Sequence, residues 1–304
     1  LGDSAVLNNC SENPDSSLPK KIFLIVSLCL FPYLFSYPQN KEPRFEHITI
    51  EDGLPENSGT AIFQDHLGYM WFGTQRGLAK YDGYKMIKYI NSKTDPGSIS
   101  GDYVQCIYED HLNNLWIGTR PIKSAGGGLN LFDRETEKFI SYLHYPDDYS
   151  CISSNYIKCI YEDNSGNLWI GTENGLNIFN REKENFISIK FPISSNGINE
   201  SLIVESILED KVTKKILVAT NYGLYSLTSS NYNAPLSNFQ IELINSNEFR
   251  WATNLYQTED GIIWLISNYI LYSYDSENDN IIPFPITLSY KNSIFEDSSG
   301  IIWI

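Results

Sequence analysis

Side chains that commonly carry out catalysis are scarce in this chain. It has four histidines, His47, His66, His111 and His144. His66 and His111 each follow an aspartate in two similar segments, so we expect them in equivalent turns that do not converge on one site. Carboxylate pairs such as Glu109-Asp110 recur in the same segments, which favours a structural role over acid/base catalysis. The sequence therefore predicts no catalytic residue, no metal site and no cofactor.

A repeated segment accounts for most of the chain. Its landmark, usually tryptophan, lies at Trp71, Trp116, Trp169, Leu217, Trp264 and Trp303, at intervals of 45, 53, 48, 47 and 39 residues. This is the repeat length of a four-stranded propeller blade. Each copy reads as four short apolar strands bounded by Gly, Asn, Asp and Ser, without a helical period. We therefore predict an all-β fold, a β-propeller of four-stranded blades with five complete copies and part of a sixth.

Two residue types of the repeat are predicted to be structural. One is an aspartate before the first turn, at Asp65, Asp110, Asp163, Asp210 and Asp297. Its side chain is expected to accept backbone N–H groups of the turn. The other is the tryptophan, which is expected to fill the space between blades, where truncation costs about 3–5 kcal/mol. Two copies depart from the pattern, because Leu217 replaces the tryptophan in the fourth and Thr258 replaces the aspartate in the fifth.

The first 36 residues differ from the repeat. Lys20 and Lys21 precede an apolar run from 22 to 37 that contains Pro32 and is shorter than the ~20 residues of a spanning helix. A positive segment before a short apolar run is typical of a secretory signal peptide, with a retained N-terminal anchor as the alternative. The net charge of −15 argues against a nucleic-acid footprint. We expect an exported protein with no nucleic-acid partner in this region.

The repeat resembles that of two-component regulator propellers. The pattern E-D-x-x-G-x-L-W-I-G-T-x-x-G-L-x-x-Y/F-D carries the resemblance over roughly residues 44–304. It implies the N-terminal part of the periplasmic sensor region of a hybrid histidine kinase of the polysaccharide-utilisation type. Such a parent is an inner-membrane protein, a homodimer with seven-bladed propellers and an ATP-dependent protein histidine kinase. The resemblance further implies an oligosaccharide ligand and no enzymatic activity in this part of the parent.

The signal-peptide pattern and the resemblance together suggest domain boundaries. We expect upstream residues and a signal peptide at 1–36, the first propeller at 37–304, and the strand that closes its ring at 44–50. Two other functions stay open, a propeller enzyme acting on polysaccharide (a lyase or glycosidase) and a non-catalytic adhesion or scaffold propeller. The gene beyond residue 304 would separate these three alternatives.

Candidate binding residues come from the links that a propeller presents at one end. They are Arg76, Arg120, Lys123, Tyr222, Arg250 and Trp251. Arginine hydrogen-bonds sugar hydroxyls, whereas tyrosine and tryptophan stack on the apolar faces of pyranose rings. Arg120 and Lys123 belong to an insertion at 120–127 that no other copy has, and such a loop-borne feature is not explained by packing.

The first prediction concerns stability. Five blades and part of a sixth leave one sheet edge without a partner, so residues 37–304 produced alone should be poorly stable or aggregate. Size-exclusion chromatography with a thermal melt would measure this, and a cooperative melt of a monomer would contradict it.

Overall fold

The computed structural model describes residues 47–122, 126–192, 201–229, 239–244, 251–278, 280–288 and 293–304. The regular elements in these ranges are β-strands, each paired antiparallel with its neighbour in sequence. They form five four-stranded sheets and one two-stranded sheet, all within the compact unit Ile48–Ile304. The predicted signal peptide at 1–36 lies outside the described residues.

Each four-stranded sheet is a meander whose strand order follows the sequence. Blade one contains β1 (Gly59–Gln64), β2 (Met70–Thr74), β3 (Gly77–Tyr81) and β4 (Met86–Tyr89). Blade two contains β5 (Tyr103–Glu109), β6 (Leu115–Arg120), β7 (Gly128–Asp133) and β8 (Lys138–Tyr142). Blade three contains β9 (Ile157–Glu162), β10 (Leu168–Thr172), β11 (Gly175–Asn180) and β12 (Asn185–Ile189). Blade four contains β13 (Val204–Glu209), β14 (Ile216–Thr220), β15 (Gly223–Ser229) and β16 (Phe239–Ile244). Blade five contains β17 (Ala252–Gln257), β18 (Ile263–Ser267), β19 (Ile270–Asp275) and β20 (Asn280–Thr287).

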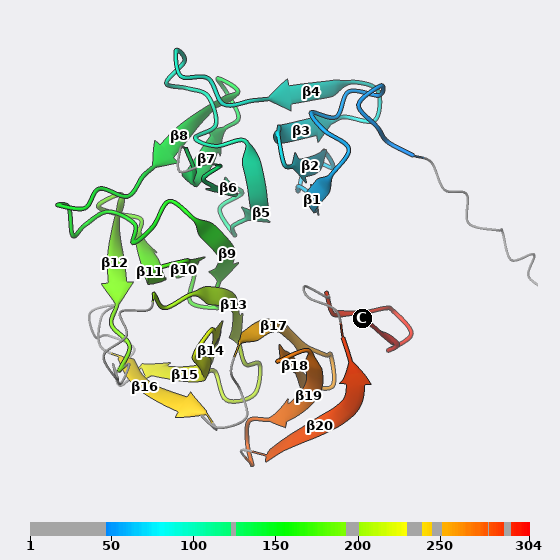
Figure 1. Ribbon diagram of the computed structural model, residues 1–304, viewed down its shortest axis with the longest axis vertical. Helices are drawn as coiled ribbons and strands as arrows, with labels where there is room; N and C mark the ends of the chain where they lie inside the picture. Colours follow the sequence, from blue (N-terminus) through cyan, green and yellow to red (C-terminus); the bar gives the residue numbers. More distant parts are fainter. Residues whose placement is uncertain are drawn as a thin grey trace, which may run out of the picture. The chain divides into compact units, whose positions relative to one another are not determined.

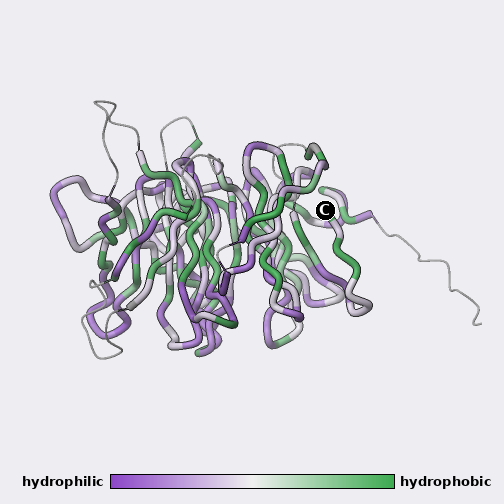
Figure 2. Tube along the Cα trace, turned by 90° about the horizontal axis from the view of Figure 1, so that it is seen from below, coloured by the Kyte–Doolittle hydropathy of each residue, from purple (hydrophilic) through white to green (hydrophobic). Residues whose placement is uncertain are grey.

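The sheets follow one another like the blades of a propeller. The first strand of each blade contacts the first strand of the next, from β1 through β5, β9 and β13 to β17. Figure 1 shows these first strands innermost and the fourth strands outermost. In the view turned by 90°, the strands run between the same two ends, where hydrophilic residues gather in the loops (Figure 2). The predicted all-β propeller fold is confirmed.

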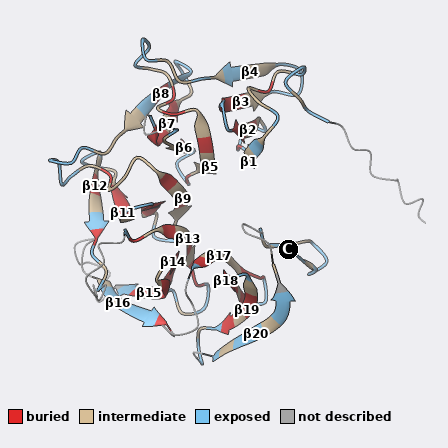
Figure 3. Cartoon of the chain, viewed as in Figure 1, coloured by how far each residue is buried: buried red, intermediate tan, exposed pale blue. Residues whose placement is uncertain are grey.

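The apolar core lies between neighbouring blades. Trp71 of β2 is fully buried and clusters with Val104 and Ile117 of blade two. Trp116 and Trp169 pack in the same way against blades three and four. The outer strands are much more exposed than the inner ones (Figure 3). Each blade therefore depends on its neighbours to bury its apolar side chains, as in other repeat architectures.

In each of blades one to five, the pairing of the first strand with the second skips one residue of the first strand. The skipped residues are Thr60, Gln105, Lys158, Glu205 and Thr253. A β-bulge of this kind re-aims a side chain out of the regular alternation. The hydroxyl of Thr60 donates to the carbonyl of Val104 in blade two at 2.6 Å, and Lys158 Nζ lies 2.9 Å from Glu205 Oε1 in blade four. These bulge residues thus connect successive blades along the innermost strands.

The closing strand expected at 44–50 stays a prediction. Its first three residues lie outside the described ranges, and residues 47–50 lie in no strand.

The described part of blade six consists of β21 (Phe295–Glu296) and β22 (Ile302–Trp303). There, Trp303 Nε1 donates to Asp297 Oδ2 at 2.8 Å, as in the earlier blades.

A glycine substitution tests how closely the blades approach. A Cβ added at Gly118 would lie 2.5 Å from Cys106 Sγ and 2.6 Å from Cγ2 of Ile157 in blade three. We expect Gly118→Ala to lower the free energy of unfolding by about 1–3 kcal/mol, the usual cost of overpacking a core. Urea unfolding of the full-length protein would measure the loss. Gly59→Ala is the matched control, because nothing lies within 4 Å of a Cβ at Gly59; equal losses in the two variants would contradict the prediction.

Candidate functional site

The two ends of the propeller carry different side chains. Because the strands are antiparallel, the turns between first and second strands lie at one end, which we call the latch end. The turns between second and third strands and the connections between blades lie at the opposite end, which we call the platform end. The repeat aspartates lie at the latch end.

At the latch end, the repeat aspartate binds the turn that follows it and the tryptophan of its own blade. Asp110 Oδ1 accepts the backbone N–H groups of Leu112 at 3.0 Å and Asn114 at 2.9 Å, and Oδ2 accepts Nε1–H of Trp116 at 2.9 Å. The same aspartate–tryptophan bond is made by Asp65–Trp71, Asp163–Trp169 and Asp297–Trp303. The aspartate therefore fixes both the first turn and the ring that packs on the next blade.

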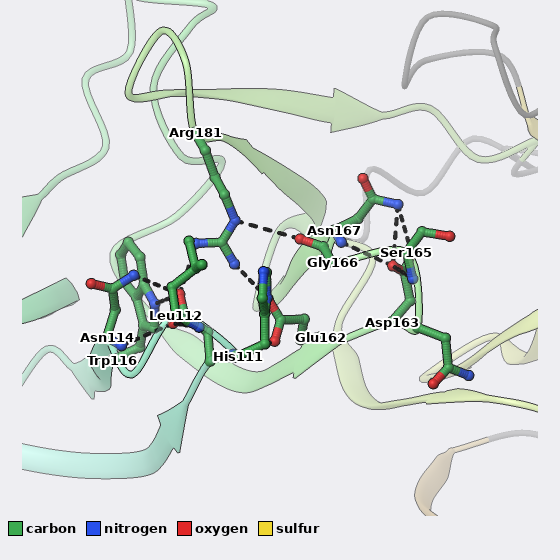
Figure 4. Close-up of polar contacts among 12 residues, drawn as sticks. His111, Leu112, Asn114, Trp116, Glu162, Asp163, Ser165, Gly166, Asn167 and Arg181 are labelled. Carbon is green, nitrogen blue, oxygen red and sulfur yellow. Dashed lines mark hydrogen bonds and ion pairs between the residues drawn. The ribbon is translucent and has the colours of Figure 1, made fainter. Parts of the chain in front are cut away.

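The next blade completes this arrangement. Glu162, at the end of β9, accepts the backbone N–H of His111 at 2.7 Å and lies 2.7 Å from His111 Nδ1. Arg181, directly after β11, donates to Glu162 Oε1 and, at 2.7 Å, to Asp110 Oδ2 (Figure 4). At the junction of blades one and two the same roles are taken by His66, Glu109, Arg134 and Asp65. One arginine thus joins carboxylates of two blades, and both histidines are engaged in these junctions.

These contacts set the ionisation of the aspartates. Burial alone would raise the pKa of Asp65 and Asp110, but hydrogen bonds from the tryptophan and the arginine outweigh it and hold each pKa below 3.8. For Asp210, bonds from Ser276, Thr213 and Gln257 outweigh burial and lower the pKa to about 2. All three carboxyls are therefore ionised at neutral pH and act as hydrogen-bond acceptors rather than as proton donors.

The fifth blade lacks the repeat aspartate. The hydroxyl of Thr258 donates instead to the carbonyl of Ile262 at 2.9 Å. Among the described residues, Nε1 of Trp264 consequently has no hydrogen-bond partner. The backbone N–H of Glu259 still donates to Glu296 of blade six at 3.0 Å. The bond between blades persists where the bond within the blade is lost.

Four of the six predicted binding residues are described, and all four lie at the platform end. Lys123 and Arg250 lie outside the described residues. Arg76 is exposed in the turn between β2 and β3. Tyr222 is partly buried in the turn between β14 and β15, where it packs against the core between blades three and four. Its environment shows that part of this side chain serves packing.

Trp251 lies next to that turn. It precedes β17, the residue is 50% exposed, and its backbone has a φ of 56°. The Trp251 N–H donates to the carbonyl of Asn221 at 3.4 Å, which places it beside the residue that precedes Tyr222. The structure thus brings Trp251 close to the Tyr222 turn of the neighbouring blade.

Arg120, at the end of β6, packs among aromatic rings of two blades. Its Cζ lies 3.6 Å from the centre of the Tyr103 ring and 5.6 Å from that of Tyr156. Nη1 of Arg120 donates to the Tyr156 hydroxyl at 3.1 Å. Lys158 Nζ lies 4.8 Å from the centre of the Tyr156 ring. These four residues, which we call the Arg120 cluster, join blades two and three at the platform end.

Gly127, at the end of the insertion at 120–127, lies close to the backbone of the two neighbouring connections. The Gly127 N–H donates to the carbonyl of Ser100 at 3.0 Å, and its φ is +86°. A Cβ at Gly127 would lie 2.6 Å from the carbonyl oxygen of Asn155 and 2.7 Å from the Pro121 nitrogen. Only glycine tolerates both this φ and this approach. The described ends of the insertion are thus held against the connections on both sides of blade two.

A separate groove of about 700 Å³ lies beside the outer strand of blade three. Its lining includes His144, Tyr149, Asn174 and Lys190, and the Tyr149 side chain is 95% exposed. The groove combines hydrogen-bonding groups with an exposed aromatic ring.

Comparison with known proteins identifies the repeats. The family model for the two component regulator propeller matches residues 98–120 and 151–174. The chain carries two-component regulator propeller repeats. The two matched segments contain every residue of the Arg120 cluster.

Relatives extend this comparison. The chain is 38% identical over 78 residues to histidine kinase P4 of Formosa agariphila, a match that covers 25% of this chain and 6% of that kinase. It is similar in fold to the extracellular domain of BT3049 from B. thetaiotaomicron, described as a hybrid two component system, with a TM-score of 0.69 and 23% identity over 85% of this chain. The extracellular domain of BT4673, described as a one component system, gives a TM-score of 0.61 and 23% identity over 83% of this chain. The chain spans about a third of each of these two structures.

Three residues of the Arg120 cluster were missed by sequence reasoning. Tyr103 and Tyr156 occupy corresponding places in YVQCIYED and YIKCIYED, and Lys158 follows at the bulge position. Alignment of the repeats could have found this signal.

Among the described residues, no group of three or more His, Cys, Asp or Glu side chains could hold a metal ion. The described part of the chain also contains no helix that could span a membrane.

The arginine between two carboxylates offers a stability test. Arg181→Met would leave Asp110 and Glu162 without their cation, and breaking such a partly buried pair typically costs about 3–5 kcal/mol. We expect a loss toward the lower end of this range, because the Arg181 side chain is 26% exposed. Urea unfolding at several pH values would measure it. The loss should be present at pH 7 and shrink as the pH falls toward 3, because protonation removes the unpaired charges.

Glu137→Gln provides the control. It breaks an ion pair with Lys80 whose carboxylate partner is 46% exposed. An exposed pair contributes at most about 1 kcal/mol. A loss in Arg181→Met no larger than in this control would contradict the proposed importance of the bridge.

Proposed function

We propose that this chain is the extracytoplasmic ligand-sensing propeller of a hybrid histidine kinase that detects glycan fragments. The observation that carries the proposal is the match of regulator propeller repeats to residues 98–120 and 151–174. The 38% identity to histidine kinase P4 supports a kinase parent. Under this proposal the parent is a dimeric inner-membrane protein that holds the propeller in the periplasm and controls transcription of polysaccharide-utilisation genes.

The division of the propeller into two ends supports ligand binding at the platform end. At the latch end, the arginines and carboxylates of the first junctions bind one another and hold the blades together. At the platform end, Trp251 and Tyr269 are each about half exposed, and Arg76 is exposed as well. Aromatic faces with nearby hydrogen-bond donors suit the mixed polar and apolar surface of a sugar.

The surrounding gene sequence would separate the sensor from the enzyme and the scaffold. A further propeller, a membrane-spanning helix and a kinase core in the same reading frame would support the sensor. A stop codon directly after a seventh blade would contradict it.

Calorimetry tests ligand sensing directly. We expect the full-length protein to bind one class of oligosaccharide from a panel of purified glycans. Trp251→Ala should weaken this binding roughly fivefold or more, because removal of an aromatic anchor commonly costs over 1 kcal/mol of binding free energy. Tyr84→Ala is the matched control, since Tyr84 is 97% exposed in a turn at the latch end. Absence of binding heat with every glycan would contradict the proposal.

A further inference from the structure

Arg120 differs from the other partly buried arginines. Arg134 and Arg181 are each paired with two carboxylates, at side-chain exposures of 23% and 26%. Arg120 is also partly buried, yet no described residue offers it a carboxylate. A cation withdrawn from water is costly unless an anion compensates it. Arg120 is therefore a cation for which the described residues supply no anion.

The hydrogen-bonding groups of Arg120 are only partly used. Nη1 donates to the Tyr156 hydroxyl at 3.1 Å, and the Tyr103 ring stacks against the guanidinium at 3.6 Å. Nε of Arg120 is buried and has no hydrogen-bond partner among the described residues. Contact with the Tyr103 ring orients the guanidinium, whose planar set of N–H donors is of the type that binds a carboxylate or a sulfate.

A second unpartnered group lies on the neighbouring strand. Gln105 Oε1 is likewise buried without a hydrogen-bond partner among the described residues. Gln105 is the bulge residue of β5, two positions after Tyr103. Two neighbouring strands of blade two thus each carry a buried polar atom without a hydrogen-bond partner among the described residues, a donor on Arg120 and an acceptor on Gln105. A ligand with an anionic group and a neighbouring hydroxyl would satisfy both kinds of group.

The Arg120 cluster contains a second cation, Lys158. Lys158, the bulge residue of β9, lies 4.8 Å from the centre of the Tyr156 ring and is paired with Glu205 at 2.9 Å. Its charge is therefore largely balanced, which leaves Arg120 as the cation of the cluster that lacks an anion among the described residues. The chain as a whole carries a net charge of −15, so its surface in general repels anions. A local site for an anion needs a specific arrangement of this kind.

We propose that the Arg120 cluster binds the anionic group of an acidic oligosaccharide, a carboxylate or a sulfate ester, at the junction of blades two and three. This inference rests on the proposed function, because it names the ligand class of a glycan sensor. Arg120 supplies the charge-assisted bond, Tyr103 and Tyr156 hold the guanidinium, and Gln105 accepts a sugar hydroxyl.

Calorimetry with the unmodified full-length protein gives the first test. The probes are a glucuronate-containing disaccharide, the methyl ester of the same disaccharide, and a disaccharide that carries a sulfate ester in place of the carboxylate. We expect the charged forms to bind at least about tenfold more tightly than the methyl ester, and the difference to shrink as salt is added. Preference for the uronate or for the sulfate identifies the natural anion.

Arg120→Gln gives the second test. It should reduce the affinity for the charged disaccharide to that for the methyl ester and leave the methyl ester unaffected. Lys183→Gln is the matched control, because it removes one positive charge from an exposed turn at the latch end of blade three. If Arg120→Gln fails to fold, the comparison of acid and ester on the unmodified protein still decides the matter.

The outcomes separate this inference from the proposed function. Equal affinity for acid and ester, or full affinity in folded Arg120→Gln, would overturn the anion site. Binding of neutral oligosaccharides alone would overturn it as well and would leave the glycan sensor standing. Absence of binding with every carbohydrate would overturn both.

Discussion

The structure depends on one bond between blades, in which the backbone N–H after the first strand is accepted by a side chain of the next blade. The acceptors are Glu109, Glu162, Glu209, Gln257 and Glu296. The bond recurs at all five junctions among the described residues, including those where tryptophan, aspartate or arginine is replaced. A backbone N–H cannot be lost by substitution except to proline, so this donor is always present and the acceptor alone must be kept. Because each blade buries its apolar side chains against the next, this bond also sets how the blades pack.

The buried acceptor determines what else the latch end must contain. A carboxylate withdrawn from water needs a cation or several donors, and Arg181 meets that need for Glu162 and Asp110 together. Where the arginine is absent, neutral groups take over, as Ser276 does for Asp210. At the first two junctions, Glu109, Glu162, His66 and His111 are therefore engaged in contacts between blades. The opposite end is correspondingly free to differ from blade to blade, as the insertion at 120–127 shows.

Local sequence pattern predicted the fold because each blade repeats the same short-range signals. Turn residues, alternating apolar strands and a landmark residue, usually tryptophan, every 39 to 53 residues depend only on near neighbours. The bridge by Arg181 could not be predicted in this way, because it joins residues 71 positions apart. The insertion made Arg120 a candidate binding residue, and that role stays a prediction; its contacts with Tyr103 and Tyr156 depend on the packing of two blades and could not be predicted from a local pattern. The bulges were missed because a single strand does not show which of its residues the pairing skips.

The two ends of β6 show how one strand serves both purposes. Trp116, near its start, bonds to Asp110 and packs against blade three, while Arg120, at its end, contacts Tyr156 of that same blade. At the first contact, the charge of Asp110 is balanced within the protein, because its carboxylate is paired with Arg181. At the second contact, the charge of Arg120 is not balanced by an anion, because no described carboxylate pairs with it; its partners are the Tyr103 ring and the Tyr156 hydroxyl. A natural sequence keeps such an uncompensated charge when its removal would cost function rather than stability, since replacement by a neutral side chain would relieve the desolvation cost. The pairing at the latch end serves the packing of the blades, whereas the incomplete pairing of Arg120 is the feature on which the proposed binding at the platform end rests.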